Sequence, residues 1–114
     1  MEDKAPFTHI LVPTDGSENS IHAGRLAVQM AALHDAMLTL AYVVDSTIVE
    51  EIAGATAKSR EAIVRELEDK GQRYLDYIAR LAGHKEVQCE KVIRYGTPYN
   101  EIADLARERG VNLI

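Results

Sequence analysis

The sequence predicts an α/β fold, a three-layer, doubly wound parallel sheet with helices on both faces. Short β-rich apolar runs alternate with longer segments whose apolar residues recur at helical spacing. The first run, residues 8–14, is apolar through its middle, as in a central parallel strand buried on both faces. Alternating β and α elements of this length form parallel strands with right-handed crossovers, which cover both faces with helices.

In the first half of the chain we expect strands over residues 8–14 and 37–44, with a helix between them. Ser17 is a suitable N-cap for that helix, and Glu18 follows near the positive end of its dipole. The helical spacing predicts one buried stripe: Ala23, Leu26, Ala27, Met30 and Ala31. Residues 45–56 fit either a loop or a short helical turn.

The next segment predicts a long helix, from about Lys58 to Leu81. Its apolar side comprises Ile63, Leu67, Tyr74, Ile78 and Leu81. Gly71 lies on the same stripe, where we expect it to permit close packing. Gly83 is expected to end the helix.

After this helix we expect a third strand over residues 87–95, a last helix, and the start of a fourth strand over residues 111–114. Thr97 is the expected N-cap of the last helix, and Pro98 follows at its first position, where the missing N–H costs nothing. Gly110 is expected to end it. The expected buried stripe is Ile102, Ala103 and Ala106.

The composition limits the classes of protein to which this sequence can belong. The 114 residues are 46% hydrophobic and 27% charged, which is typical of one globular domain over residues 1–114. The net charge of −5 argues against nucleic-acid binding, which needs clustered Lys and Arg. No apolar stretch approaches the ~20 residues that span a bilayer, so no membrane association is expected. One cysteine and no signal-peptide pattern favour a cytoplasmic protein.

Asp15 is the principal candidate site residue. It stands where the first strand gives way to a helix, and open α/β sheets bind ligands just beyond the carboxyl ends of their strands. A carboxylate there accepts hydrogen bonds from the hydroxyls of a sugar, and Gly16 lets the backbone approach a ligand closely. Capping of the helix by Asp15 is an equally good interpretation, and the two roles are compatible.

The glycines argue against a phosphate site within these residues. There are seven, no two of them closer than eight positions, so neither a P-loop nor a dinucleotide fingerprint is present. Glu18, in the first helical turn, would also repel a phosphate. We expect any ligand at Asp15 to place its phosphates elsewhere.

No catalytic residue and no metal site are predicted. None of the four histidines is four residues from another, Cys89 has the position of a small core residue, and no nucleophile elbow occurs. A phosphoacceptor receiver domain is also excluded, because its acidic pair after the first strand and its acid after the third are missing.

Three segments together resemble the universal stress protein family. They are His9-Ile10-Leu11-Val12-Pro13-Thr14-Asp15-Gly16-Ser17, Ala41-Tyr42-Val43-Val44-Asp45, and Gly96-Thr97-Pro98-Tyr99-Asn100-Glu101-Ile102-Ala103 continuing to Gly110-Val111-Asn112-Leu113-Ile114. The resemblance covers essentially the whole chain, with family-like order and spacing.

The resemblance implies a Rossmann-like, adenine nucleotide alpha hydrolase-like fold with five parallel strands, usually a homodimer. It implies ATP or another adenine nucleotide as ligand, with Mg²⁺ accompanying it. Asp15 would hold the ribose, Thr14 would line the same pocket, Val43 would offer backbone groups to the adenine, and Pro13 would shape the wall.

One departure from the family pattern affects this expectation. Nucleotide-binding members carry a Gly-x2-Gly-x9-Gly-Ser/Thr stretch after the fourth strand, which holds the phosphates, and a fifth strand follows. Both would come after Ile114. We therefore expect the chain to be C-terminally incomplete, with no tightly bound nucleotide.

The resulting expectation is a non-catalytic adenine-nucleotide-binding module in stress response or signalling. Two alternatives remain open. One is a dimerising interaction protein of the same family that does not bind nucleotide, and the other is a slow ATPase.

Overall fold

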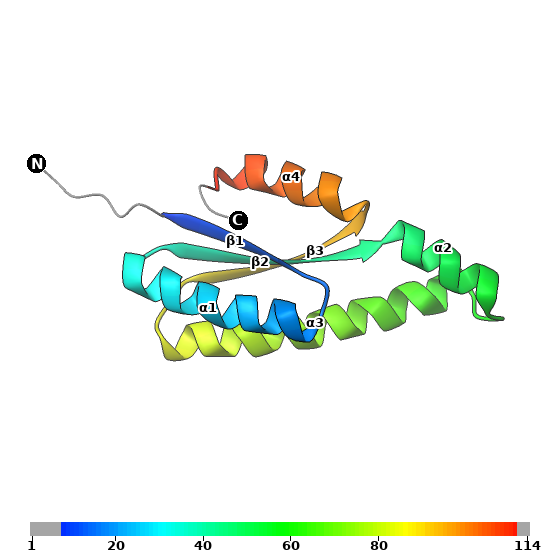
Figure 1. Ribbon diagram of the computed structural model, residues 1–114, viewed down its shortest axis with the longest axis horizontal. Helices are drawn as coiled ribbons and strands as arrows, with labels where there is room; N and C mark the ends of the chain where they lie inside the picture. The colour runs from blue at the N-terminus through cyan, green and yellow to red at the C-terminus, as the bar shows by residue number, and fades with distance from the viewer. Residues whose placement is uncertain (1–7, 112–114) are drawn as a thin grey trace, which may run out of the picture.

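The computed structural model describes residues 8–111, which form alternating strands and helices (Figure 1). The elements are β1 (His9–Thr14), α1 (Glu18–His34), β2 (Met37–Asp45), α2 (Ser46–Ala55), α3 (Arg60–His84), β3 (Cys89–Gly96) and α4 (Pro98–Arg109). The described strands form one parallel sheet in the order β1-β2-β3. The predicted α/β class and the parallel sheet are confirmed.

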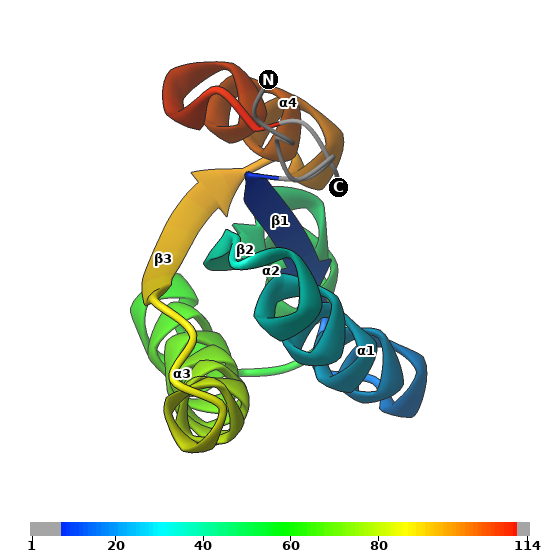
Figure 2. The same ribbon diagram turned by 90° about the vertical axis from the view of Figure 1, so that its left-hand side faces the viewer.

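The sheet separates two helical layers of unequal size. Figure 2 shows α4 on one face and α1 with α3 on the other. Because side chains alternate along a strand, each strand contributes to both faces. Leu11 and Ala41 point to the α4 side, where they pack with the fully buried Leu105. This arrangement is the three-layer architecture that the sequence predicts.

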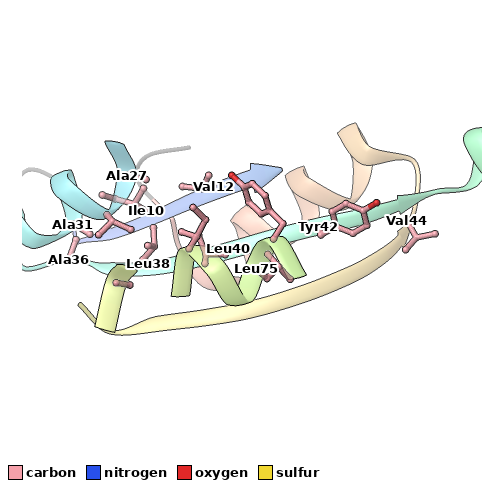
Figure 3. Close-up of a cluster of buried hydrophobic side chains, with 14 of the residues drawn as sticks. Ile10, Val12, Ala27, Ala31, Ala36, Leu38, Leu40, Tyr42, Val44 and Leu75 are labelled. Atoms are coloured by element: carbon pink, nitrogen blue, oxygen red, sulfur yellow. The ribbon is translucent and has the colours of Figure 1, made fainter. Parts of the chain in front are cut away.

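The larger core lies between the sheet and the α1/α3 layer, and part of it is drawn in Figure 3. Its fully buried members come from both strands and helices. They include Ile10, Leu38, Leu40, Ile63, Leu75 and Ile78. Fully burying side chains of this size contributes about 1.5–3 kcal/mol each, so this face dominates the hydrophobic stabilisation.

The segment that the sequence left open, residues 45–56, contains a regular helix. The Asp45 carboxylate accepts a hydrogen bond from the Thr47 N–H and caps α2. Val49 is buried, and Arg60 at the start of α3 pairs with Glu50. Figure 1 shows α2 continuing past the end of β2, so it extends the wall beyond the sheet's carboxyl edge.

The predicted cap of α1 is confirmed, but two members of its predicted stripe are wrong. Ser17 accepts a hydrogen bond from the Ser20 N–H. Ala23 and Leu26 are exposed, and the buried residues are instead Gly24, Ala27, Val28 and Ala31. Ala23 and Leu26 border an apolar cavity beside β1, the edge strand of the described sheet. Gly24 faces α3, where an added Cβ would lie 2.9 Å from Ile78 Cδ1 and 3.0 Å from the Tyr74 hydroxyl. Gly24 therefore lets α1 and α3 approach closely.

Of the two glycines assigned to α3, one has the expected role and the other does not. A Cβ at Gly71 would overlap the ring of Tyr42, so Gly71 permits close packing of α3 on the sheet, as predicted. Gly83 does not end the helix, which continues to His84. The left-handed residue that turns the chain toward β3 is Glu86, with φ 57°.

The last helix agrees with the sequence at both ends. Thr97 is the N-cap residue, although its side chain makes no capping bond, and Pro98 begins the helix. Gly110 ends it in the left-handed conformation, with φ 64°. Leu105, which the predicted stripe omitted, is its fully buried residue, and the predicted stripe residues are half-buried. The predicted fourth strand falls almost entirely on residues 112–114, outside the described residues.

A polar chain crosses the sheet beneath α4. Thr39 of β2 is fully buried, and its hydroxyl lies 2.7 Å from His9 Nε2 and 3.2 Å from the Glu90 carboxylate. Glu90 in turn accepts two hydrogen bonds from Arg109, at 2.9 and 2.8 Å. This series of hydrogen-bonded side chains, the polar chain, joins all three described strands to the end of α4.

Within residues 8–111, no helix combines the length and the apolar character that crossing a membrane requires.

Candidate functional site

A cavity of about 760 Å³ opens at the carboxyl ends of β1 and β2. The ends of the two strands form its floor, and helices from both layers form its walls. Its lining comprises Pro13, Thr14, Asp15, Ser17, Asn19, Ser20, Ala23, Tyr42, Val43, Asp45, Ile48, Leu67, Lys70, Pro98 and Ile102. All four residues that the sequence singles out, Pro13, Thr14, Asp15 and Val43, therefore lie around one cavity.

Asp15 occupies the turn between β1 and α1. Its Oδ1 accepts hydrogen bonds from the Ser17 N–H at 2.9 Å and the Ser20 hydroxyl at 3.1 Å. The Ser17 hydroxyl also interacts with the carboxylate, and no other described group bonds its second oxygen, Oδ2. Ser17, not Asp15, is the N-cap of α1. One carboxylate oxygen therefore holds the turn, and the other remains available at the cavity.

Hydrogen bonding also keeps Asp15 charged. The bonds from Ser17, first through its side chain and then through its backbone N–H, lower the pKa of the Asp15 carboxyl below its ordinary value of 3.8, and partial burial opposes them. A carboxylate that is ionised and exposed at neutral pH accepts hydrogen bonds from ligand hydroxyls without a preceding loss of a proton.

Thr14 supports this turn from beneath. Its hydroxyl donates to the Ser20 hydroxyl at 2.9 Å and accepts from the Gly16 N–H at 3.0 Å. The residue is only 8% exposed. Thr14 therefore lines the cavity while its polar group is used by the turn.

The end of β2 leaves backbone groups open beside the cavity. The pairing of β1 with β2 ends at Thr14 and Tyr42, whereas β2 continues to pair with β3 as far as Asp45. Over Val43–Asp45, β2 therefore has a neighbour on one side only. Its open side can offer backbone donors and acceptors to a planar polar group.

The sequence did not identify the other lining residues as parts of a site, and Tyr42 and Lys70 are two of these. Tyr42, which is 4% exposed, was expected only as part of a strand, and Lys70 was not singled out. The Lys70 side chain crosses the turn at Gly16, where a Cβ would lie 2.9 Å from Lys70 Cε. The available signals were the position of Tyr42 at a strand end and the glycine at position 16, but neither identifies its partner.

No metal centre is evident in residues 8–111, which contain no group of three His, Cys, Asp or Glu side chains arranged to hold an ion. Cys89 is half-buried against the larger core, and burial raises the pKa of its thiol to about 11. A thiol of that pKa is a poor nucleophile near neutral pH, in agreement with its predicted role as a small core residue.

Comparison with known proteins identifies the family. Residues 6–114 match the model of the universal stress protein family. The chain belongs to this family. It is 31% identical over 109 residues to universal stress protein MJ0531 of Methanocaldococcus jannaschii, and 31% identical over 113 residues to universal stress protein YxiE of Bacillus subtilis. These matches cover 95% of the present chain in both cases, but 62% of the first protein and 76% of the second. The chain thus spans under two thirds of the archaeal relative's length.

Solved universal stress proteins share the fold. A family member from Burkholderia pseudomallei superposes with a TM-score of 0.81 at 24% identity, covering 97% of this chain and 82% of that protein. A universal stress protein in complex with cAMP superposes with a TM-score of 0.58 at 25% identity, covering 94% of this chain and 70% of that one. The universal stress protein fold, predicted from the three sequence segments, is confirmed.

Proposed function

We propose that this universal stress protein binds an adenine nucleotide, without catalysis, in the cavity at the ends of β1 and β2. The observation that carries the proposal is the position of Asp15. Its ionised carboxylate is held at the cavity by two hydrogen bonds to Oδ1, and its Oδ2 is open. In this site Asp15 accepts hydrogen bonds from the ribose, and the open backbone at Val43 meets the edge of the adenine.

Two further points support this ligand class. The cavity volume of about 760 Å³ lies within the range of small-molecule sites. A structurally similar universal stress protein was solved in complex with cAMP, which contains the same base and sugar. We also propose that the protein acts as a homodimer, as many members of the family do.

The non-catalytic part of the proposal follows from the residues around the cavity. Hydrolysis of a phosphate ester needs a positioned base or a metal to activate water. The described residues that line the cavity include no histidine or cysteine, and the hydrogen bonds to Asp15 favour its ionised form, which makes it a weak base. ATP turnover by the purified protein that Asp15→Ala abolishes would contradict this part.

The test is an NMR titration of the chain with adenosine, AMP and ATP up to millimolar concentration. We expect shifts at Thr14–Ser17 and Val43–Asp45, and saturation at lower concentration for the nucleotides than for inosine analogues. Asp15→Asn keeps the size of the side chain and should weaken adenosine binding about ten- to a hundredfold, because a hydrogen bond to a charged group contributes about 1.5–3 kcal/mol. Asp104→Asn, at a half-buried position on α4 that does not line the cavity, is the matched control. No shift with any of the three ligands would reject the proposal.

A further inference from the structure

Tyr42 is a buried residue whose hydroxyl has no hydrogen-bond partner in the part of the chain that the structure describes. The residue is 4% exposed, and no described group hydrogen-bonds to its hydroxyl. No side-chain oxygen or nitrogen that is fully buried lacks a partner among the described residues, so the Tyr42 hydroxyl is reached from outside. Because Tyr42 lines the cavity, that access is through the cavity. A phenol in such a place usually has a hydrogen-bond partner.

The sheet register places Tyr42 beside the turn that carries Asp15. Tyr42 pairs with Thr14, the residue that precedes Asp15. Figure 3 shows the hydroxyl of Tyr42 pointing toward the carboxyl end of β2, away from the aliphatic side chains of Leu38 and Leu40. Burial, and then the nearby Asp15 charge, raise the pKa of the Tyr42 hydroxyl, which therefore keeps its proton and can donate it.

Lys70 brings a positive charge to the same side of the cavity. Its stem crosses the turn at Gly16, where a Cβ would lie 2.9 Å from Lys70 Cε and 3.6 Å from its Nζ. The charged residues of the lining are Asp15, Asp45 and Lys70. The ammonium group makes no ion pair or hydrogen bond with the described residues, whereas both acids are bonded to their turns.

We propose that Tyr42 and Lys70 are two further ligand-binding residues of this cavity, the Tyr42 hydroxyl bonding the sugar held by Asp15 and the Lys70 ammonium binding a phosphate of the same ligand. The inference rests on the proposed function and deepens it. It assigns the sugar contact to Asp15 and Tyr42, at the ends of β1 and β2. It assigns a phosphate contact to Lys70 of α3. The α1 N-terminus, where Glu18 repels anions, has no part in it.

Two ligands that differ in one group distinguish the contribution of Tyr42 from that of Lys70. Adenosine has the sugar and no phosphate, and AMP adds the phosphate. Tyr42→Phe removes one hydroxyl that makes no protein bond, so the fold is retained. We expect it to weaken adenosine and AMP equally, by about three- to tenfold, the value of one net hydrogen bond.

Lys70→Met keeps the aliphatic stem over Gly16 and removes the charge. It should weaken AMP about three- to fivefold and leave adenosine unchanged, because an exposed ion pair contributes at most about 1 kcal/mol. Lys70→Arg should retain most of the AMP affinity. Raising the salt concentration should weaken AMP binding to the wild-type chain, but not to the Lys70→Met variant. Lys85→Met, far from the cavity, is the control.

The outcomes separate this inference from the proposed function. If Asp15→Asn weakens adenosine but Tyr42→Phe does not, nucleotide binding stands and the role of Tyr42 is wrong. Equal losses for adenosine and AMP in Lys70→Met would overturn the phosphate contact and make Lys70 a support of the turn. If wild-type protein binds neither ligand, both the proposed function and this inference fail.

Discussion

Gly71 of α3 lies directly against the aromatic ring of Tyr42 on β2, so closely that a Cβ at this position would overlap the ring. The contact brings the long helix onto the sheet at the cavity end. It also holds the ring of Tyr42 in one place and directs its hydroxyl toward the strand end. A single glycine therefore links the packing of α3 to the shape of the cavity.

Gly71→Ala should destabilise the protein by about 1–3 kcal/mol. Overpacking against the Tyr42 ring outweighs the ~1 kcal/mol that alanine gains in helix propensity. Gly83→Ala is the matched control on the same helix, because nothing lies within 4 Å of its added Cβ. It should leave the stability unchanged or raise it. Urea denaturation measures both, and equal effects of the two changes would show that the Tyr42 contact is not constraining.

Thr39→Val should destabilise the protein by about 1–3 kcal/mol. The side chain is fully buried, and its loss leaves His9 and Glu90 without their shared hydroxyl. Thr47→Val, at an exposed position on α2, should change the stability by less than about 0.5 kcal/mol. A similar small effect of both changes in thermal or urea unfolding would show that the polar chain is unimportant for stability.

The same polar chain predicts the tautomer of His9. Arg109 stabilises the ionised form of Glu90 and lowers the pKa of its carboxyl, so Glu90 only accepts hydrogen bonds. The Thr39 hydroxyl must use its one proton toward Glu90, and its oxygen then accepts from His9. The neutral ring of His9 should therefore carry its proton on Nε2, which nitrogen chemical shifts measure. A neutral ring protonated on Nδ1 would contradict this arrangement.

Asp15 should titrate below the ordinary carboxyl value of 3.8, because hydrogen bonds from Ser17 and Ser20 favour its ionised form. A lowered pKa in the folded state means that the carboxylate's contribution to stability is complete above about pH 5. That contribution is lost as the pH falls through the lowered value. NMR titration of the carboxyl carbon measures the midpoint. A midpoint above 3.8 would show that these bonds do not form in solution.

Cys89 should react slowly with thiol reagents at pH 8. Its pKa of about 11 leaves little thiolate, and the side chain packs on the larger core. Unfolding in urea should increase the rate strongly, since the unfolded thiol has an ordinary pKa near 8.5. Fast labelling of the folded protein, compared with free cysteine under the same conditions, would contradict this burial.

Sequence periodicity predicted the helices and strands better than it predicted which helix face is buried. Ser17, Pro98 and Gly110 act through their own backbone neighbours, so their positions at helix ends could be read directly. Leu26 has the right spacing for a buried residue but is 48% exposed, because it lies along an apolar cavity beside β1, the edge strand of the described sheet. Residues 45–56 were ambiguous for the same reason, since burial of Val49 depends on its surroundings in the fold.

The sequence alone determined the order of the strands and helices, the family, and the position of Asp15 just beyond the first strand. These features follow from short-range spacing, capping residues and runs of apolar side chains. Only the tertiary structure brought Tyr42 and Lys70 to the cavity beside Asp15. Their approach depends on two glycines, Gly71 beneath the ring and Gly16 beneath the lysine stem, each of which faces an element distant in sequence. Contacts of that kind are decided by how helices pack on a sheet, and the local pattern of neither partner encodes them.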